Sequence, residues 1–81
     1  YFRSGEINSK VDDQQAVMEK VAEAFSDGDQ DQIDGLTVGY DDFWFNLRPS
    51  NTEPLLRLNI EANSEELLKE KTDEILKLIR T

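Results

Sequence analysis

The feature that most constrains the fold is a series of three alternating segments in the second half of the chain. Apolar residues recur at every second position in residues 36–40, 43–48 and 55–60, which is the period of a β-strand with one buried face. Two aspartates separate the first two segments, and a loop of residues 49–53 joins the second to the third. Because connections this short join antiparallel neighbours, the sequence predicts an antiparallel sheet.

Two segments with a helical period flank these strands. Residues 11–25 carry an apolar stripe at i, i+3, i+4 and i+7, and a second stripe ending at Ile79 follows a capping residue, Asn63 or Ser64. Each helix is apolar on one side only, so both are expected to cover the same face of the sheet. Residues 1–8 have weak strand character. The predicted fold is therefore α+β, a four-stranded antiparallel sheet with two helices on one face, in the order β-α-β-β-β-α.

Composition excludes several functions. The 81 residues contain no Cys and no His and carry a formal net charge of −9. Disulfides, the usual zinc sites and Ser-His-Asp or Cys-His chemistry are therefore excluded, and a reducing, cytoplasmic location is expected. The negative charge argues against a nucleic-acid or membrane partner. The length predicts a single domain over residues 1–81, and the first residue, Tyr1, indicates a piece cut from a longer protein.

The acidic connection at residues 26–35 invites a calcium hypothesis. Asp27, Asp29 and Asp31 have the spacing with which an EF-hand loop begins. However, Gln32 stands where the loop needs a glycine, and Val38 stands where it needs a bidentate glutamate. A specific calcium site is therefore disfavoured.

Positive charge in the middle of the chain is confined to one stretch, RPSNTEPLLRL. Between Lys20 and Lys69 the only cations are Arg48 and Arg57, against eleven carboxylates. The simplest hairpin register places Leu47 opposite Leu56 and turns one apolar set toward the core. In that register the two arginines are diagonal neighbours on the other face.

The loop between these strands has the composition of an anion site. Hydroxyls, an amide and successive backbone N–H groups can converge on an anion, and an arginine adds a planar fork of donors that matches phosphate. The side chains concerned are Arg48, Ser50, Asn51 and Thr52, with Pro49 and Pro54 stiffening the two ends. The alternative is that these are ordinary turn residues, with Arg57 paired to Glu53 or Glu61.

The open face of the sheet carries Trp44. This side chain could stack on a ligand, pack on a neighbouring domain or cover the sheet, and we favour domain packing. A protein-interaction module that docks through this face, using Trp44 and Leu55, is the alternative to a phosphate-binding function.

The stretch GLTVGYDDFWFNLRPSNTEPLLRLNIEA resembles the carboxy-terminal domain of the α-D-phosphohexomutases, and most of all that of bacterial phosphomannomutase/phosphoglucomutase. The resemblance extends from the SGEIN segment to the final helix. Its specific core is R-P-S-N-T-E-P followed by an alternating strand that ends in E-A. The resemblance implies an antiparallel sheet backed by two helices, similar to the TATA-binding-protein-like arrangement.

The resemblance also implies a role. These enzymes interconvert hexose 1-phosphates and 6-phosphates, including those of mannose and glucose, through a phosphoserine and a bound magnesium ion. Their fourth domain holds the phosphate that is not reacting. By matching position, the phosphate-binding residues here are Arg48, Ser50, Asn51 and Thr52. Glu53 is expected to order the loop or meet another domain, and Arg57 to be an accessory residue.

The remaining machinery of the family has no counterpart in these residues. The phosphoserine loop, the metal-binding aspartates and the sugar-reading loop belong to three preceding domains. The resemblance therefore implies no catalytic residue and no cofactor in this chain, with Mg²⁺ on another domain of the parent enzyme. We expect the fragment alone to be inactive, and its partners to be a phosphorylated hexose and the other domains of that enzyme.

Overall fold

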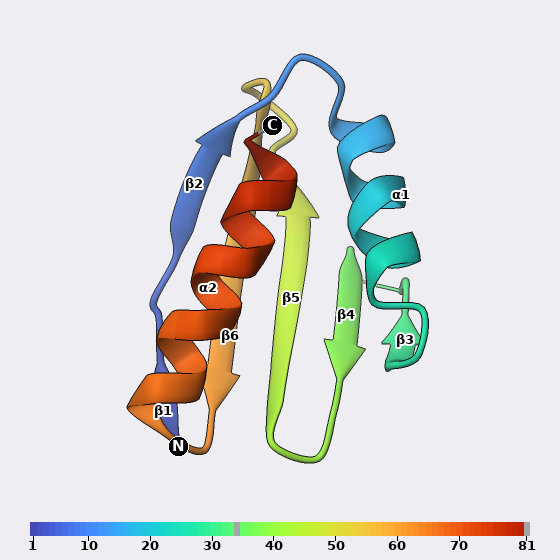
Figure 1. Cartoon of the computed structure of the whole chain (residues 1–81). Coiled ribbons are helices and arrows are strands. Elements are labelled where there is room, and N and C mark those ends of the chain that lie inside the picture. Colours follow the sequence, from blue (N-terminus) through green and yellow to red (C-terminus); the bar gives the residue numbers. More distant parts are fainter. Residues whose placement is uncertain (34, 81) are drawn as a thin grey trace.

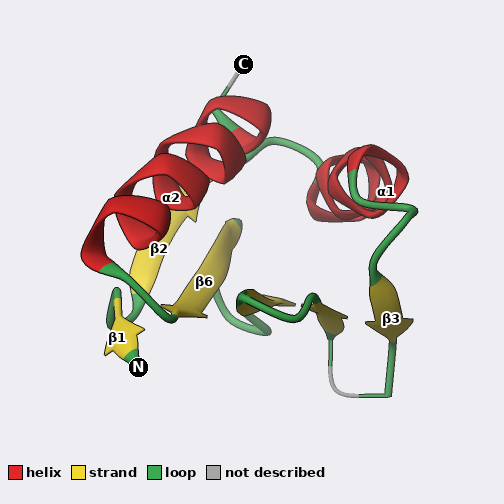
Figure 2. Cartoon of the chain, turned by 60° about the horizontal axis from the view of Figure 1, so that its bottom comes forward, coloured by secondary structure: helices red, strands yellow, loops and turns green. Residues whose placement is uncertain are grey.

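The sheet and its two helices form two layers. The computed structural model describes residues 1–33 and 35–80. Figure 1 shows both helices in front of the sheet, and Figure 2 shows the same two layers from another side. The described elements are β1 (Phe2–Arg3), β2 (Ile7–Lys10), α1 (Gln14–Ala24), β3 (Asp29–Asp31), β4 (Leu36–Gly39), β5 (Phe43–Pro49), β6 (Leu55–Ala62) and α2 (Glu65–Ile79). The α+β class, the antiparallel pairing and the one-sided helices are confirmed.

The sheet has six described strands, so the expectation of four was wrong. Its order is β1-β6-β5-β4-β3, with β2 also paired to β6. Strands β1 and β2 pair with opposite ends of β6, and Ser4 interrupts them. The Ser4 hydroxyl oxygen accepts the Ile60 N–H at 3.0 Å, and Gly5 follows with a φ of 74°. A side-chain oxygen thus replaces a backbone acceptor, which splits the expected first strand into two.

Strand β3 lies within the segment expected to be a polar connection. Gln30 is opposite Val38 of β4, and its side-chain amide donates to the Ala22 and Phe25 carbonyls at 2.7 and 2.9 Å. These bonds occupy carbonyls at the carboxyl end of α1, which have no partner within the helix. Strand β3 lies at the edge of the sheet, and hydrogen bonds from the Gln30 side chain hold it in place. It therefore needs no buried apolar side chains. One residue of that connection, Asp34, lies outside the described residues.

The β5–β6 hairpin has the expected faces but a different register. Leu47 is opposite Leu58, and Pro49 is opposite Leu56. The expected pairing of Leu47 with Leu56 was therefore wrong by two positions. Alternation determines only the parity of a register, because a shift by two leaves every side chain on its own face.

The helices begin at capping residues. Asp13 caps α1 by accepting the Ala16 N–H at 3.1 Å, and Ser64 caps α2 by accepting the Leu67 N–H at 3.1 Å. Helix α1 therefore begins three residues later than the apolar pattern indicated. Among the described residues, the core between the helices and the sheet contains fourteen buried apolar side chains: Val11, Val21, Phe25, Leu36, Val38, Phe43, Phe45, Leu47, Leu56, Leu58, Ile60, Ala62, Ile75 and Ile79.

Neither helix in residues 1–33 and 35–80 is long and apolar enough to cross a membrane. The likeness to the TATA-binding-protein arrangement stays a prediction.

Candidate functional site

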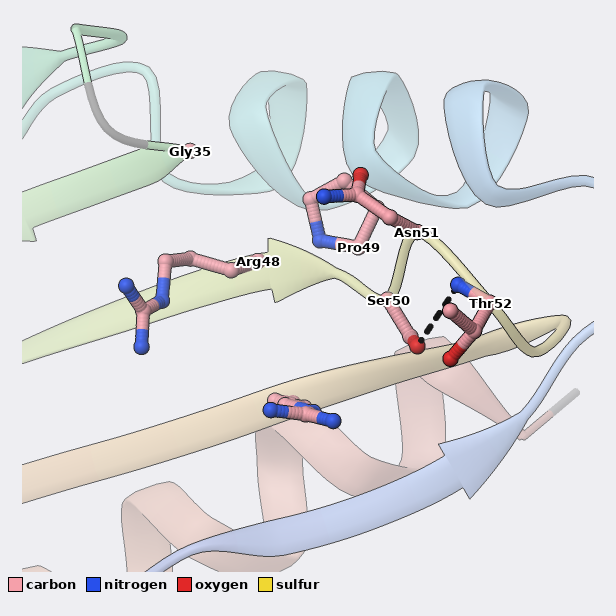
Figure 3. A pocket seen from close by; sticks show the side chains of 7 residues that line it. Gly35, Arg48, Pro49, Ser50, Asn51 and Thr52 are labelled. Atoms are coloured by element: carbon pink, nitrogen blue, oxygen red, sulfur yellow. Dashed lines mark hydrogen bonds between the residues drawn. The ribbon is translucent and has the colours of Figure 1, made fainter.

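An open pocket lies where β5 runs into the loop of residues 50–54. Its volume is about 520 Å³, and Figure 3 shows the side chains around it. The lining residues are Gly35, Arg48, Pro49, Ser50, Asn51, Thr52 and Arg57. The fold therefore brings the four predicted phosphate-binding residues and the accessory Arg57 to one pocket. Glu53 is absent from this lining.

The two arginines are direct neighbours across the hairpin. Arg48 of β5 is opposite Arg57 of β6, whereas the expected register made them diagonal neighbours. Both are exposed on the face of the sheet that the helices leave open. Within the described residues, Arg57 forms no ion pair, and Glu61 pairs instead with Arg3 at 2.9 Å. Two like charges in directly opposed positions repel each other across a sheet.

Gly35 provides the space beside Arg48 and was not singled out in the sequence. Its φ is +75°, and a Cβ placed there would lie 2.5 Å from Arg48 Cγ and 2.7 Å from the Leu47 carbonyl oxygen. Only glycine combines that backbone conformation with so close an approach. The Asp-Gly pair at residues 34–35 indicates a turn, but nothing local indicates that the glycine meets β5.

Ser50 organises the loop from within. It is buried, and its hydroxyl oxygen accepts the N–H groups of Thr52 and Glu53, each at 3.3 Å. Its own N–H donates to the Leu55 carbonyl at 3.0 Å. Two of the amides that could have formed an anion nest are thus directed at Ser50, through long and weak hydrogen bonds.

The pocket residues do not converge on a single point. Figure 3 shows the Arg48 side chain extending along the sheet, away from Ser50 and Thr52. Asn51 and Thr52 are exposed at the loop, so their side-chain donors can reach a ligand from solvent. The Arg48 guanidinium and the donors of the loop therefore lie apart within one pocket.

Gln14 supports the loop from the helix side and was also missed. Its side-chain amide donates to the carbonyls of Ser50, Glu53 and Leu55 at 3.1, 3.2 and 2.8 Å. Gln14 is 36 residues from Ser50 in sequence, and nothing in its own segment indicates this contact.

Two described aspartates of the acidic segment accept hydrogen bonds from nearby groups. Asp27 accepts a 2.6 Å hydrogen bond from the Tyr40 hydroxyl, and Asp31 accepts the Ile33 N–H at 2.8 Å. Burial, followed by the hydrogen bond and the charge of Asp27, raises the pKa of Tyr40 to about 12. Among the residues that the structure describes, no group of three or more acidic side chains is placed to hold a metal ion.

The open face of the sheet carries a second pocket. Trp44 is 37% exposed and lines it together with Asn46, Asn59 and Glu61. Leu55 is buried with 8% exposure and pairs with Lys10 of β2. Leu55 therefore offers little exposed surface for docking, although it keeps the same side of β6 as Arg57.

Comparisons with known proteins identify the family of this domain. The family model for the phosphoglucomutase/phosphomannomutase C-terminal domain matches residues 6–78. The chain is 56% identical over 79 residues to a phosphomannomutase of Methanocaldococcus jannaschii, covering 98% of the chain and 18% of that protein. It is 46% identical over 80 residues to the phosphohexose mutases of Xanthomonas campestris pv. campestris, covering 95% of the chain and 18% of that protein.

A phosphomannomutase of Vibrio cholerae is 42% identical over 80 residues, covering 95% of the chain and 17% of that protein. The chain therefore spans less than a fifth of the length of these curated relatives. The fold and the matches define a domain of the phosphohexomutase class. The chain belongs to the phosphoglucomutase/phosphomannomutase C-terminal domain family.

Proposed function

We propose that the chain is the substrate-phosphate-binding domain of a phosphohexomutase that interconverts the 1-phosphate and 6-phosphate of mannose or glucose through a phosphoserine. The observation that carries this proposal is the opposed pair Arg48 and Arg57 in one pocket with the Ser50-organised loop. In a chain with a net charge of −9, this pair is a local exception. An anion bound between the guanidinium groups would relieve their mutual repulsion.

Each lining residue has a distinct role in the proposal. Arg48 and Arg57 supply charge and planar donor forks, while Asn51 and Thr52 supply exposed donors from the loop. Ser50 holds the loop and retains a hydroxyl hydrogen to donate. The Arg48 side chain must turn toward the loop for all of these groups to reach one phosphate. That movement is within the rotamer freedom of a long exposed side chain.

The expected affinity of the chain by itself is low. A hydrogen bond to a charged group contributes roughly 1.5–3 kcal/mol, and ordering the ligand and side chains offsets much of the total. A net binding free energy of about −4 kcal/mol corresponds to a Kd of about 1 mM. The phosphoserine and the Mg²⁺ ion are proposed to belong to other domains of the parent enzyme. The chain alone is therefore expected to have no mutase activity.

A titration followed by NMR tests the proposal. The labelled 81-residue chain is titrated with mannose 1-phosphate, glucose 1-phosphate and inorganic phosphate into the tens of millimolar, with sodium chloride at matched ionic strength as the control. The amide signals of Arg48, Ser50, Asn51 and Thr52 are expected to move first. Arg57→Gln should weaken the response, whereas Lys77→Gln, which removes the same charge from α2, should not. Unmoved loop signals, or equal movement in sodium chloride, would reject the site.

The second candidate function is docking of another protein surface on the open face. The exposure of Trp44 beside the second pocket favours it. A partner that is retained by Arg48→Ala but lost by Trp44→Ala would support docking through this face. Loss of the phosphate response in Trp44→Ala would argue instead that the indole serves the ligand site.

A further inference from the structure

Four carbonyl groups of the loop region are bonded from the helix side of the sheet. Gln14, the first residue of α1, donates its side-chain amide to the carbonyls of Ser50, Glu53 and Leu55 at 3.1, 3.2 and 2.8 Å. The Val11 N–H donates to the Pro54 carbonyl at 2.9 Å. Figure 1 places this loop at the same end of the sheet as the start of α1.

The direction of these carbonyls matters for an anion site. A carbonyl oxygen carries partial negative charge, so one that faced the pocket would repel phosphate, whereas an N–H would attract it. Gln14 is not among the pocket-lining residues, and it lies in the helix layer while Arg48 and Arg57 lie on the open face. The carbonyls bonded to Gln14 are therefore held on the side away from the guanidinium groups.

Glutamine is suited to this position by length and by charge. Its two amide hydrogens serve three acceptors through shared bonds. Asparagine is shorter by one methylene and cannot reach all three. Glutamate has the length, but its carboxylate would face three carbonyl oxygens without a hydrogen to donate.

We propose that Gln14 is a positioning residue that holds the carbonyl groups of Ser50, Glu53 and Leu55 toward α1, so that these three carbonyls do not face the pocket. It does not touch the ligand. The consequence for phosphate binding rests on the proposed function, whereas the holding of the loop can be measured without any ligand.

The ligand-free arm compares the wild type with Gln14→Met, which keeps the length and removes the donor. Gln15→Met is the matched control, because the Gln15 side chain is exposed and donates a long hydrogen bond to the Glu19 carboxylate, at 3.4 Å. Carbonyl carbon shifts of Ser50, Glu53 and Leu55 are expected to move in Gln14→Met, and the Thr52 and Glu53 amides to exchange about tenfold faster, equivalent to one net hydrogen bond. Unchanged shifts and exchange in Gln14→Met would overturn the proposal.

The phosphate arm separates positioning from general stability. Gln14→Met is expected to bind inorganic phosphate about tenfold more weakly than the wild type. Ile75→Val changes a buried residue of α2, so it lowers stability without altering the loop and should leave the phosphate Kd unchanged. Equal phosphate Kd values in Gln14→Met and the wild type would overturn the positioning role. If the wild-type chain does not bind phosphate, the proposed function is rejected. The ligand-free experiment would still test whether Gln14 holds the loop.

A measurement on the wild type covers the case in which Gln14→Met does not fold. The side-chain amide hydrogens of Gln14 are expected to exchange at least about tenfold more slowly than those of Gln15, because they are bonded to three carbonyls. Equal exchange of the two side chains would overturn the proposal.

Discussion

Arg48 of β5 and Arg57 of β6 stand directly opposite each other, on the face of the sheet that neither helix covers. Opposed cross-strand side chains are the closest pairs in an antiparallel sheet, and like charges there are destabilising. The chain therefore places two positive charges side by side at its candidate site, although acidic residues outnumber basic ones by 18 to 9. Repulsion between the two charges lowers the free energy of unfolding, whereas the same two charges favour the binding of an anion.

Removing one of the two charges should stabilise the chain while weakening the site. Arg57→Gln is expected to raise the free energy of unfolding by about 0.5 kcal/mol at low salt. Chemical denaturation measures this change, and the gain should disappear in 0.5 M salt because the charges are screened. The same variant should bind inorganic phosphate more weakly. A variant that loses stability and keeps its affinity would contradict the assignment.

Phosphate affinity should depend on the protonation of the ligand. A phosphate monoester becomes a dianion with a pKa near 6, and the chain has no histidine to titrate in that range. If the arginine pair selects the dianion, mannose 1-phosphate should bind about tenfold more weakly at pH 5 than at pH 7. Sulfate, which stays a dianion over this range, is the control. A flat profile for mannose 1-phosphate would show that the monoanion binds equally well.

Gly35 should tolerate no side chain. Gly35→Ala places a Cβ 2.7 Å from the Leu47 carbonyl oxygen at a φ of +75°, so a loss of about 2 kcal/mol in the free energy of unfolding is expected. Phosphate binding should also weaken, because Arg48 Cγ is displaced. Gly39→Ala is the control, since its Cβ would meet nothing nearer than 3.8 Å. Similar losses in both variants would indicate a general glycine effect instead.

Tyr40 should make stability fall at high pH. Its pKa is raised from 10.0 to about 12 in the folded chain, by burial first and then by Asp27. The unfolded state therefore loses this proton more readily, so the contribution of Tyr40 to the free energy of unfolding should be fully present below pH 10 and decline between pH 10 and 12. Tyr40→Phe, which keeps the ring stacked on Phe43 at 4.7 Å, should flatten that decline in denaturation experiments. Tyr1→Phe, at a residue that is 83% exposed, should not.

The sequence predicts which side of each strand is buried better than it predicts which residues pair. Phe45, Leu47 and Leu58 all face the core as expected, because the two-residue period decides the face. The register depends on how the loop closes, and the Ser50 N–H bond to the Leu55 carbonyl has no signature in the alternation. Strand β3 was missed for a similar reason, since a polar edge strand needs no apolar pattern.

Some residues of the candidate site can be predicted from a local motif, and others are revealed only by contacts in the folded chain. Arg48, Ser50, Asn51 and Thr52 are contiguous or nearly so, and a local motif is enough to select them. Gly35 and Gln14 reach the site only through tertiary structure, the first across the β4–β5 pair and the second from a helix cap region. Residues that shape a loop from a distance are recognised by their contacts, which a single sequence does not display.

The bonds that Gln14 and Val11 make to the loop have a mechanical consequence. A hairpin connection attached only through its two strands can bend independently of its domain. This one is tied to the beginning of α1, so a pull on Asn51 or Thr52 is passed to the helix and the sheet together. In the proposed parent enzyme, a sugar phosphate bound at this tip would move the whole domain as a rigid body, and the loop would not bend by itself.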